Sequence, residues 1–256
     1  MNDGLTTTQI AQELAHKGLF FFHYDTVDST NSEAKRCAAK IALPAVLVAD
    51  AQSAGRGRMG RSFFSPRNTG LYFSYLTNRL APENTVGLTA AAAVATARAI
   101  ARVTGIETEI KWVNDLLLDG KKIAGILCER FMSDERSFVV IGIGINLATA
   151  DFPDDLRHKA GSLGACTSIR DHLALVLAEE LHALVSALPD RAFMEEYRTR
   201  SAVLGRRVRY TVNGETYDAE ALAIDDGGGL LVRAENGRET LLASGEISLA
   251  YEINEK

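Results

Sequence analysis

The stretch IKWVNDLLLDGKKIAGILCERF, residues 110–131, decides the fold class of this 256-residue chain. Two runs rich in branched apolar residues flank Asp119-Gly120, a dipeptide favoured in two-residue type I′ hairpin turns. The pattern predicts two antiparallel strands joined at this turn, with residues 111–115 together on the first strand. On that strand Lys111 and Val113 would face one side, and Trp112 and Asn114 the other.

Outside the hairpin, strands and helices follow one another without regular alternation. Apolar and β-branched runs predict strands over 19–27, 43–50, 71–77 and 137–147. Helical patterns cover 7–17, a segment starting near Asn31, 86–105, 169–188 and 192–200. Thr30 and Glu33 have the spacing of a capping box ahead of the second helix. This arrangement favours an α+β fold, in which a mixed or antiparallel sheet is packed with helices.

The character of the sequence changes near Ala202. From about Gly205 to the C-terminal end, short strand patterns alternate with frequent glycine turns, which is typical of a small β-barrel. We therefore predict two domains, residues 1–202 and 203–256.

Composition excludes several classes of protein. The net charge of −5 offers nothing that recommends a nucleic-acid partner, so we expect no DNA binding. No run reaches the ~18 apolar residues that a membrane span needs, and the N-terminus is unlike a secretory signal. The three cysteines lack zinc-site spacing, which favours reduced thiols and a cytoplasmic protein.

The segment GRGRMGR, residues 55–61, places three arginines among three glycines in a long segment between two predicted strands. Arginine forks match carboxylate and phosphate oxygens, and glycines let the backbone approach a ligand. A solvated basic loop is the plainer interpretation, but the absence of other basic clusters favours an anion clamp. A compact domain seldom contains a structureless loop of this length unless the loop binds something.

Two nucleotide motifs are absent. No P-loop sequence occurs, and Gly142-Ile143-Gly144 is followed by Leu147 where a dinucleotide fingerprint needs its third glycine. Four other segments occur in order: DSTN at 28–31, GRGRMGR at 55–61, KWVNDLLLDGKKIAG at 111–125 and GIGIN at 142–146. Together they resemble the biotin protein ligases, and the resemblance extends from Asp28 to the GEISL segment at 245–249.

The resemblance implies that biotin and ATP are substrates, that Mg²⁺ accompanies ATP, and that biotinyl-5′-AMP is the intermediate. The biotinyl group would pass to a lysine of a biotin carboxyl carrier protein domain. The C-terminal domain would be an SH3-like barrel, and a homodimer is compatible with the family. Only about twenty residues precede the first predicted strand, so we expect the form without a DNA-binding domain.

The resemblance also assigns roles to residues, and it assigns no metal ligand. The implied catalytic residues are Lys122, Arg58 and Asp115. The implied biotin-binding residues are Ser29, Thr30, Asn31, Gln52, Gly55, Arg56, Gly57, Arg58, Lys122 and Gly125. The implied nucleotide-binding residues are Arg56, Arg58, Arg61, Phe63, Asn114 and Asn146. Gly142 and Gly144 would line the pocket that holds adenine and biotin.

Each assignment has a plainer alternative. Residues 29–31 could only cap a helix, Lys122 could be an exposed turn lysine, and the strand glycines could only ease packing. The chain also departs from the family: Val113 stands where proline is usual, and Phe63 and Phe64 stand near the usual tryptophan. A lipoate or octanoate carrier-protein acyltransferase, or a non-catalytic protein that binds biotin or an adenylate, remains as an alternative function.

Overall fold

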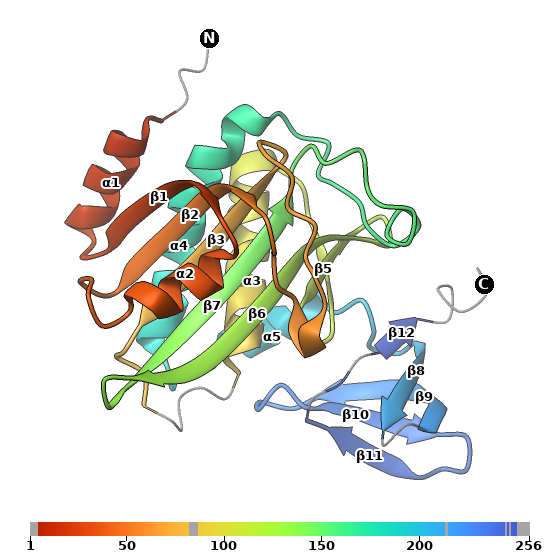
Figure 1. Cartoon of the computed structure of the whole chain (residues 1–256). Helices are drawn as coiled ribbons and strands as arrows, with labels where there is room; N and C mark the ends of the chain where they lie inside the picture. The colour runs from red at the N-terminus through yellow and green to blue at the C-terminus, as the bar shows by residue number, and fades with distance from the viewer. Residues whose placement is uncertain (1–4, 82–86, 213–214, 244, 246, 250–256) are drawn as a thin grey trace.

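A seven-stranded mixed sheet forms the centre of the larger part of the protein (Figure 1). The computed structural model describes residues 5–81, 87–212, 215–243, 245 and 247–249. The sheet order is β1-β2-β3-β7-β6-β5-β4; β1 and β2 are parallel and every other neighbouring pair is antiparallel. The strands are β1 (Phe20–Val27), β2 (Ala45–Gln52), β3 (Gly70–Thr77), β4 (Glu109–Lys111), β5 (Asp115–Leu118), β6 (Lys121–Ser133) and β7 (Arg136–Asn146). The predicted α+β class with a mixed sheet is confirmed.

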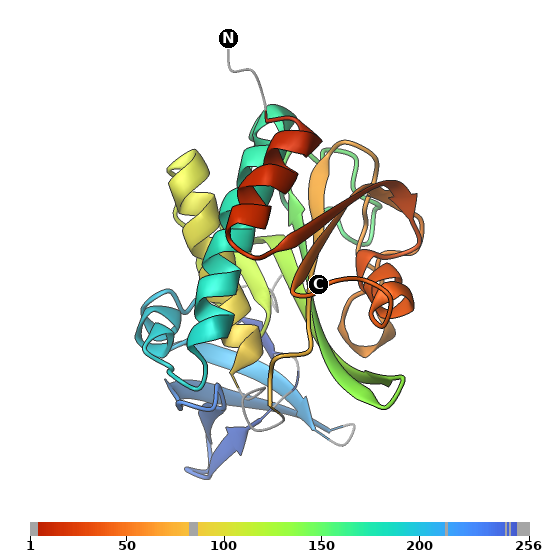
Figure 2. The ribbon, with the colours of Figure 1, turned by 90° about the vertical axis from the view of Figure 1, so that its left-hand side faces the viewer.

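Helices cover the two faces of this sheet unequally, as Figure 2 shows from the side. The helices are α1 (Thr7–His16), α2 (Thr30–Cys37), α3 (Leu88–Thr104), α4 (Arg170–Ala187) and α5 (Phe193–Thr199). The long helices α3 and α4 pack on one face, and the short α2 lies on the other. Alanines of α3 are buried on several sides of the helix, so α3 can approach both the sheet and α4 closely. None of the described helices is long and apolar enough to cross a membrane.

The Asp119-Gly120 turn is confirmed, because both residues have positive φ, of 50° and 75°. The prediction of one strand over residues 111–115 is wrong. The chain folds back at residues 112–114, so β4 ends at Lys111 and pairs antiparallel with β5, in which Asp115 lies opposite Lys111. The apolar run hides this turn from sequence analysis, and its physical basis is tertiary: Trp112 is buried and donates from Nε1 to the carbonyl of Gly228, 2.8 Å away.

The predicted capping box of α2 is also wrong. The helix begins at Thr30 with Ser29 as its N-cap residue, and the Ser29 side chain makes no capping hydrogen bond. The Thr30 hydroxyl is engaged elsewhere: it lies 2.8 Å from the Ser74 hydroxyl and 3.3 Å from Gln52 Oε1. A complete capping box occurs instead at α1, where Thr6 and Gln9 satisfy each other's backbone N–H groups.

The C-terminal part is a five-stranded antiparallel sheet in the order β11-β10-β9-β8-β12. Its strands are β8 (Arg207–Val212), β9 (Glu215–Ile224), β10 (Leu230–Ala234), β11 (Glu239–Leu242) and β12 (Ile247–Leu249). Closure of this sheet into an SH3-like barrel stays a prediction, as does the domain boundary at 202/203. The last strand pattern, over 245–253, lies partly outside the described residues.

The start of α2 generates a testable pH dependence. Hydrogen bonds of 2.7 and 2.8 Å from the Arg36 guanidinium lower the pKa of Asp28 to about 2. Because the carboxyl has a lower pKa in the folded than in the unfolded state, its contribution is complete above about pH 4. It is lost as the pH falls towards 2.

We therefore expect Asp28→Asn to lower the free energy of unfolding at pH 7 by at most ~1 kcal/mol, since the ion pair is half exposed. The difference from the parent protein should shrink below pH 4, as measured by urea unfolding at several pH values. A difference that grows with acid would contradict this account. Asp154→Asn, in a more exposed ion pair with Arg157, serves as control.

Candidate functional site

A patch without side chains occupies the face of the sheet on which α2 lies. Gly125 of β6 is directly opposite Gly144 of β7, and Gly142 lies two residues before Gly144 in the same strand. A Cβ atom at Gly144 would lie 2.4 Å from the ring of Phe63, and one at Gly142 would lie 2.3 Å from Asn31 Oδ1. The glycines therefore allow two other segments of the chain to lie directly on the sheet backbone.

The predicted biotin-binding residues at the start of α2 form a buried polar network. Gln52 Oε1 accepts from the Thr30 backbone N–H at 2.8 Å, and Gln52 Nε2 donates to Ser65 Oγ at 2.8 Å. The Ser74 hydroxyl donates to Asn31 Oδ1 at 2.7 Å. Ser29, Thr30 and Asn31 are each less than 5% exposed. The structure thus places Thr30, Asn31 and Gln52 in one buried hydrogen-bonded network, with Ser29 buried beside it.

The glycine-rich segment is an ordered turn and not a structureless loop. Arg56 pairs with Ser62 in an antiparallel bridge, and the Gly57 N–H donates to the Arg61 carbonyl at 2.7 Å. A one-turn 3₁₀ helix, Arg58–Gly60, forms the tip. We call residues 55–63 the arginine hairpin. It crosses the sheet face in Figure 1 and delivers the Phe63 ring to the patch at Gly125 and Gly144.

Two of the predicted catalytic residues, Lys122 and Arg58, contact consecutive residues at the junction of the 112–114 turn and β5. Lys122 Nζ lies 2.7 Å from Asp115 Oδ1, in an ion contact without the alignment of a hydrogen bond. Arg58 donates to Asn114 Oδ1 at 3.1 Å and to the Gly245 carbonyl at 3.2 Å. Arg58 and Lys122, far apart in the sequence, therefore contact consecutive residues, Asn114 and Asp115.

Gly125 lies close to Lys122, whereas Gly55 lies against Phe63, Ser65 and Gln52. A Cβ at Gly125 would be 3.1 Å from Lys122 Nζ, and a Cβ at Gly55 would be 2.3 Å from the Phe63 carbonyl. Asn146 lies near the segment that pairs with Lys122: its Nδ2 donates to the Gly161 carbonyl at 2.9 Å, while the Gly161 N–H donates to the Lys122 carbonyl. Asn146 Oδ1 is buried and has no hydrogen-bond partner within the described ranges.

Sequence analysis missed three polar residues that hold the site together: Ser65, Ser74 and Glu129. Ser74 is the one polar residue between buried neighbours in the strand LYFSYLT, which was a usable signal. Glu129 lies on the strand that carries Gly125, four residues further on, and a carboxylate there was equally visible. Phe64 is separate from the patch, because its ring packs against Phe152.

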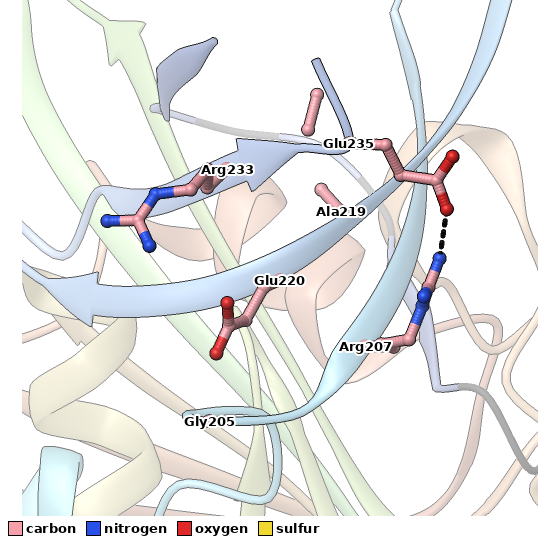
Figure 3. A pocket seen from close by; sticks show the side chains of 7 residues that line it. Gly205, Arg207, Ala219, Glu220, Arg233 and Glu235 are labelled. Carbon is pink, nitrogen blue, oxygen red and sulfur yellow. Dashed lines mark hydrogen bonds and ion pairs between the residues drawn. The ribbon is translucent and has the colours of Figure 1, made fainter. Parts of the chain in front are cut away.

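The described residues contain no group of three or more His, Cys, Asp or Glu side chains able to hold a metal ion. A surface depression of about 360 Å³ lies on the C-terminal sheet, lined by residues such as Arg207, Glu220 and Glu235 (Figure 3). None of the predicted site residues lines it.

Comparison with known proteins agrees with this geometry. A family model described as "Biotin/lipoate A/B protein ligase family" matches residues 25–146, and one described as "Biotin protein ligase C terminal domain" matches residues 203–250. Fold and sequence together thus define a protein of the biotin and lipoate ligase class.

Individual relatives narrow this class. "Bifunctional ligase/repressor BirA" of Bacillus subtilis (strain 168) is 35% identical over 249 residues, which cover 91% of this chain and 73% of that protein. "Biotin--[acetyl-CoA-carboxylase] ligase" of Paracoccus denitrificans is 33% identical over 234 residues, covering 85% and 95%. The structure "Biotin protein ligase from Aquifex aeolicus in complex with biotin and ATP" has a TM-score of 0.75 at 28% identity and covers 90% and 97%. The chain belongs to the biotin protein ligase family.

The patch generates a stability prediction. Gly142→Ala would push Asn31 off β7 and break its hydrogen bond with Ser74. We expect a loss of ~1–3 kcal/mol in the free energy of unfolding, as is usual for overpacking. Chemical denaturation measures it.

Gly57→Ala is the matched control, because the nearest atom to its Cβ would be the Arg61 carbonyl oxygen at 3.4 Å, and Gly57 has an ordinary φ of −113°. Equal stability losses in the two variants would show that the close contact of Asn31 with Gly142 is not what makes glycine necessary.

Proposed function

We propose that the protein activates biotin with ATP to biotinyl-5′-AMP and transfers biotin to a lysine of a biotin carboxyl carrier protein domain. The observation that carries the proposal is that Arg58 and Lys122 contact consecutive residues, Asn114 and Asp115. The names of the relatives and the biotin and ATP of the Aquifex aeolicus complex support the choice of substrates.

Activation joins two anions, so their mutual repulsion must be reduced. An oxygen of the biotin carboxylate attacks the α-phosphorus of ATP, the new P–O bond forms, and pyrophosphate leaves. Fixed cations stabilise the negative charge that develops on the α-phosphate oxygens. Lys122 and Arg58 are the cations proposed for this role, with Arg61 contributing from the arginine hairpin.

Binding would replace interactions that these residues now make with each other. The substrate carboxylate or a phosphate oxygen would take the place of Asp115 beside Lys122. Ser29, Thr30, Asn31 and Gln52 would surround the biotin rings, with hydroxyl and amide groups suited to a ureido group. Gly55, Gly57 and Gly125 would allow close approach of the backbone. Asn146 Oδ1, buried without a partner, would accept from a donor such as the adenine amino group.

Transfer needs a neutral amine. The lysine nitrogen of the carrier domain attacks the carbonyl carbon of the mixed anhydride, an amide forms, and AMP leaves. Asp115, once released from Lys122, is the proposed acceptor of the amine proton.

The nucleotide needs a ring partner and a metal ion. Phe63 offers a ring for stacking on adenine. Mg²⁺ would bind chiefly through ATP phosphates and water, and the ion would neutralise phosphate charge. Asp115 is a carboxylate, which is the kind of oxygen ligand that Mg²⁺ binds.

The central test is mass spectrometry of a biotin carboxyl carrier domain after incubation with the protein, biotin and Mg-ATP. We expect one added biotinyl group and no competition by lipoate. In Lys122→Ala we expect the rate to fall at least roughly 100-fold, because a preorganised cation is lost. Lys121→Ala, at the exposed neighbouring position, is the matched control. Loss of activity in both variants, or modification with lipoate, would refute the assignment.

A second test concerns retention of the intermediate. Arg58→Gly removes a cation and loosens the arginine hairpin, so we expect biotinyl-5′-AMP to escape and to modify exposed lysines of an unrelated protein such as serum albumin. Streptavidin blotting measures that labelling. Met59→Gly is the control, because Met59 is 78% exposed and its φ of 54° suits glycine. Equal labelling by both variants would show that chain flexibility and not the Arg58 cation controls retention.

A further inference from the structure

Glu129 of β6 connects three segments that carry predicted site residues. Its Oε2 accepts from Asn31 Nδ2 at 3.1 Å, and its Oε1 accepts from Lys35 Nζ at 2.7 Å. Arg56 NH2 lies 3.2 Å from the same Oε1. One carboxylate thus contacts α2 twice and the arginine hairpin once, while its own strand begins with the lysines at 121–122.

The contact separates the roles of two arginines in the hairpin. Arg58, at the tip, reaches Asn114 and the C-terminal segment. Arg56, at the base, lies opposite Ser62 in the bridge that closes the hairpin, and its guanidinium turns to Glu129. An ion pair at the base fixes where the hairpin leaves the sheet, whereas one at the tip would not.

The same carboxylate fixes the Asn31 side chain. The amide nitrogen of Asn31 donates to both Leu127 O and Glu129 Oε2, each at 3.1 Å, and its oxygen accepts from Ser74. Both N–H bonds of the amide are therefore used inside the protein. Asn31 holds α2 against the sheet, and Glu129 supplies one of the bonds that decide which way the amide points.

Glu129 differs from an ordinary surface ion pair. Only 18% of its side chain is exposed, compared with 45% for Arg56 and 29% for Lys35. Burial raises the pKa of Glu129, but hydrogen bonds from Lys35 and Asn31 outweigh burial and hold the pKa below its ordinary value. The carboxylate is therefore charged at neutral pH, and a half-buried charge with three partners has a defined geometry.

We propose that Glu129 is a positioning residue of the ligase, whose carboxylate ties the base of the arginine hairpin to the start of α2 through Arg56, Lys35 and Asn31. Its consequence for biotin binding rests on the proposed function, whereas the tie itself does not. The Arg56 guanidinium then acts as an anchor, and anion binding falls to Arg58 and Arg61.

Hydrogen–deuterium exchange tests the tie without any substrate. In Glu129→Gln, the amides of Gly57, Arg61 and Phe63, whose hydrogen bonds close the hairpin, should exchange roughly fivefold faster, the size expected for losing a partly exposed ion pair. Glu33→Gln is the matched control: Glu33 also pairs with an arginine, Arg36, and lies on α2, but it has no contact with the hairpin. Unchanged exchange in Glu129→Gln, or equal acceleration in the control, would overturn the proposal.

A double-mutant cycle with Arg56→Gln tests the consequence for biotinylation. Glu129→Gln should raise the KM for biotin roughly fivefold while leaving kcat near the parent value, because positioning is lost but the reacting groups remain. In the Arg56→Gln background the same change should have little further effect. Additive effects, or a fall in kcat alone, would overturn the proposal. If the parent protein does not biotinylate the carrier domain, the proposed function fails. The exchange experiment still shows whether Glu129 connects the base of the arginine hairpin to α2.

Discussion

The arrangement of the site depends on three positions without side chains, Gly125 of β6 and Gly142 and Gly144 of β7. Gly125 and Gly144 lie opposite each other, and a Cβ at Gly142 or Gly144 would overlap with atoms of another segment. On the opposite face, α3 and α4 contribute apolar side chains to an ordinary packed core. The glycine patch makes the α2 face different: a ring and an amide rest directly on strand backbone, so polar groups can be held within hydrogen-bond distance of the sheet.

The cationic side chains at the site already have partners. Lys122 contacts Asp115, Arg58 contacts Asn114, and Arg56 contacts Glu129. A cation that faces a partly buried carboxylate has a fixed position, because the ion pair compensates for the desolvation of both groups. In the proposed reaction a substrate carboxylate would take the place of Asp115 beside Lys122, so that one anion is exchanged for another of the same kind. Such an exchange changes the charge balance of the site less than binding an anion beside an unpaired lysine would.

Local signals predicted the frame of the molecule, and long-range contacts decided what they could not. The Asp119-Gly120 turn, the strands and the helices follow from neighbouring residues, and the structure agrees with them. The turn at 112–114 stayed hidden because Trp112 is held by Gly228, 116 residues away in sequence. The carboxylate of Glu129 was visible in the sequence, but its partner Asn31, 98 residues away, was not. The capping motif at Thr30 misled because Ser74 competes for its hydroxyl.

The 112–114 turn also explains how the C-terminal sheet can influence a site on the other sheet. The Trp112 ring, on one side of the turn, donates to the Gly228 carbonyl, which lies between β9 and β10. Arg58 spans from Asn114, on the other side of the turn, to the Gly245 carbonyl ahead of β12. Both connections end on backbone carbonyls, so they depend on where the C-terminal chain runs and not on its side chains. The position of a proposed catalytic cation is therefore set jointly by both sheets, and a family resemblance confined to the larger sheet could not account for it.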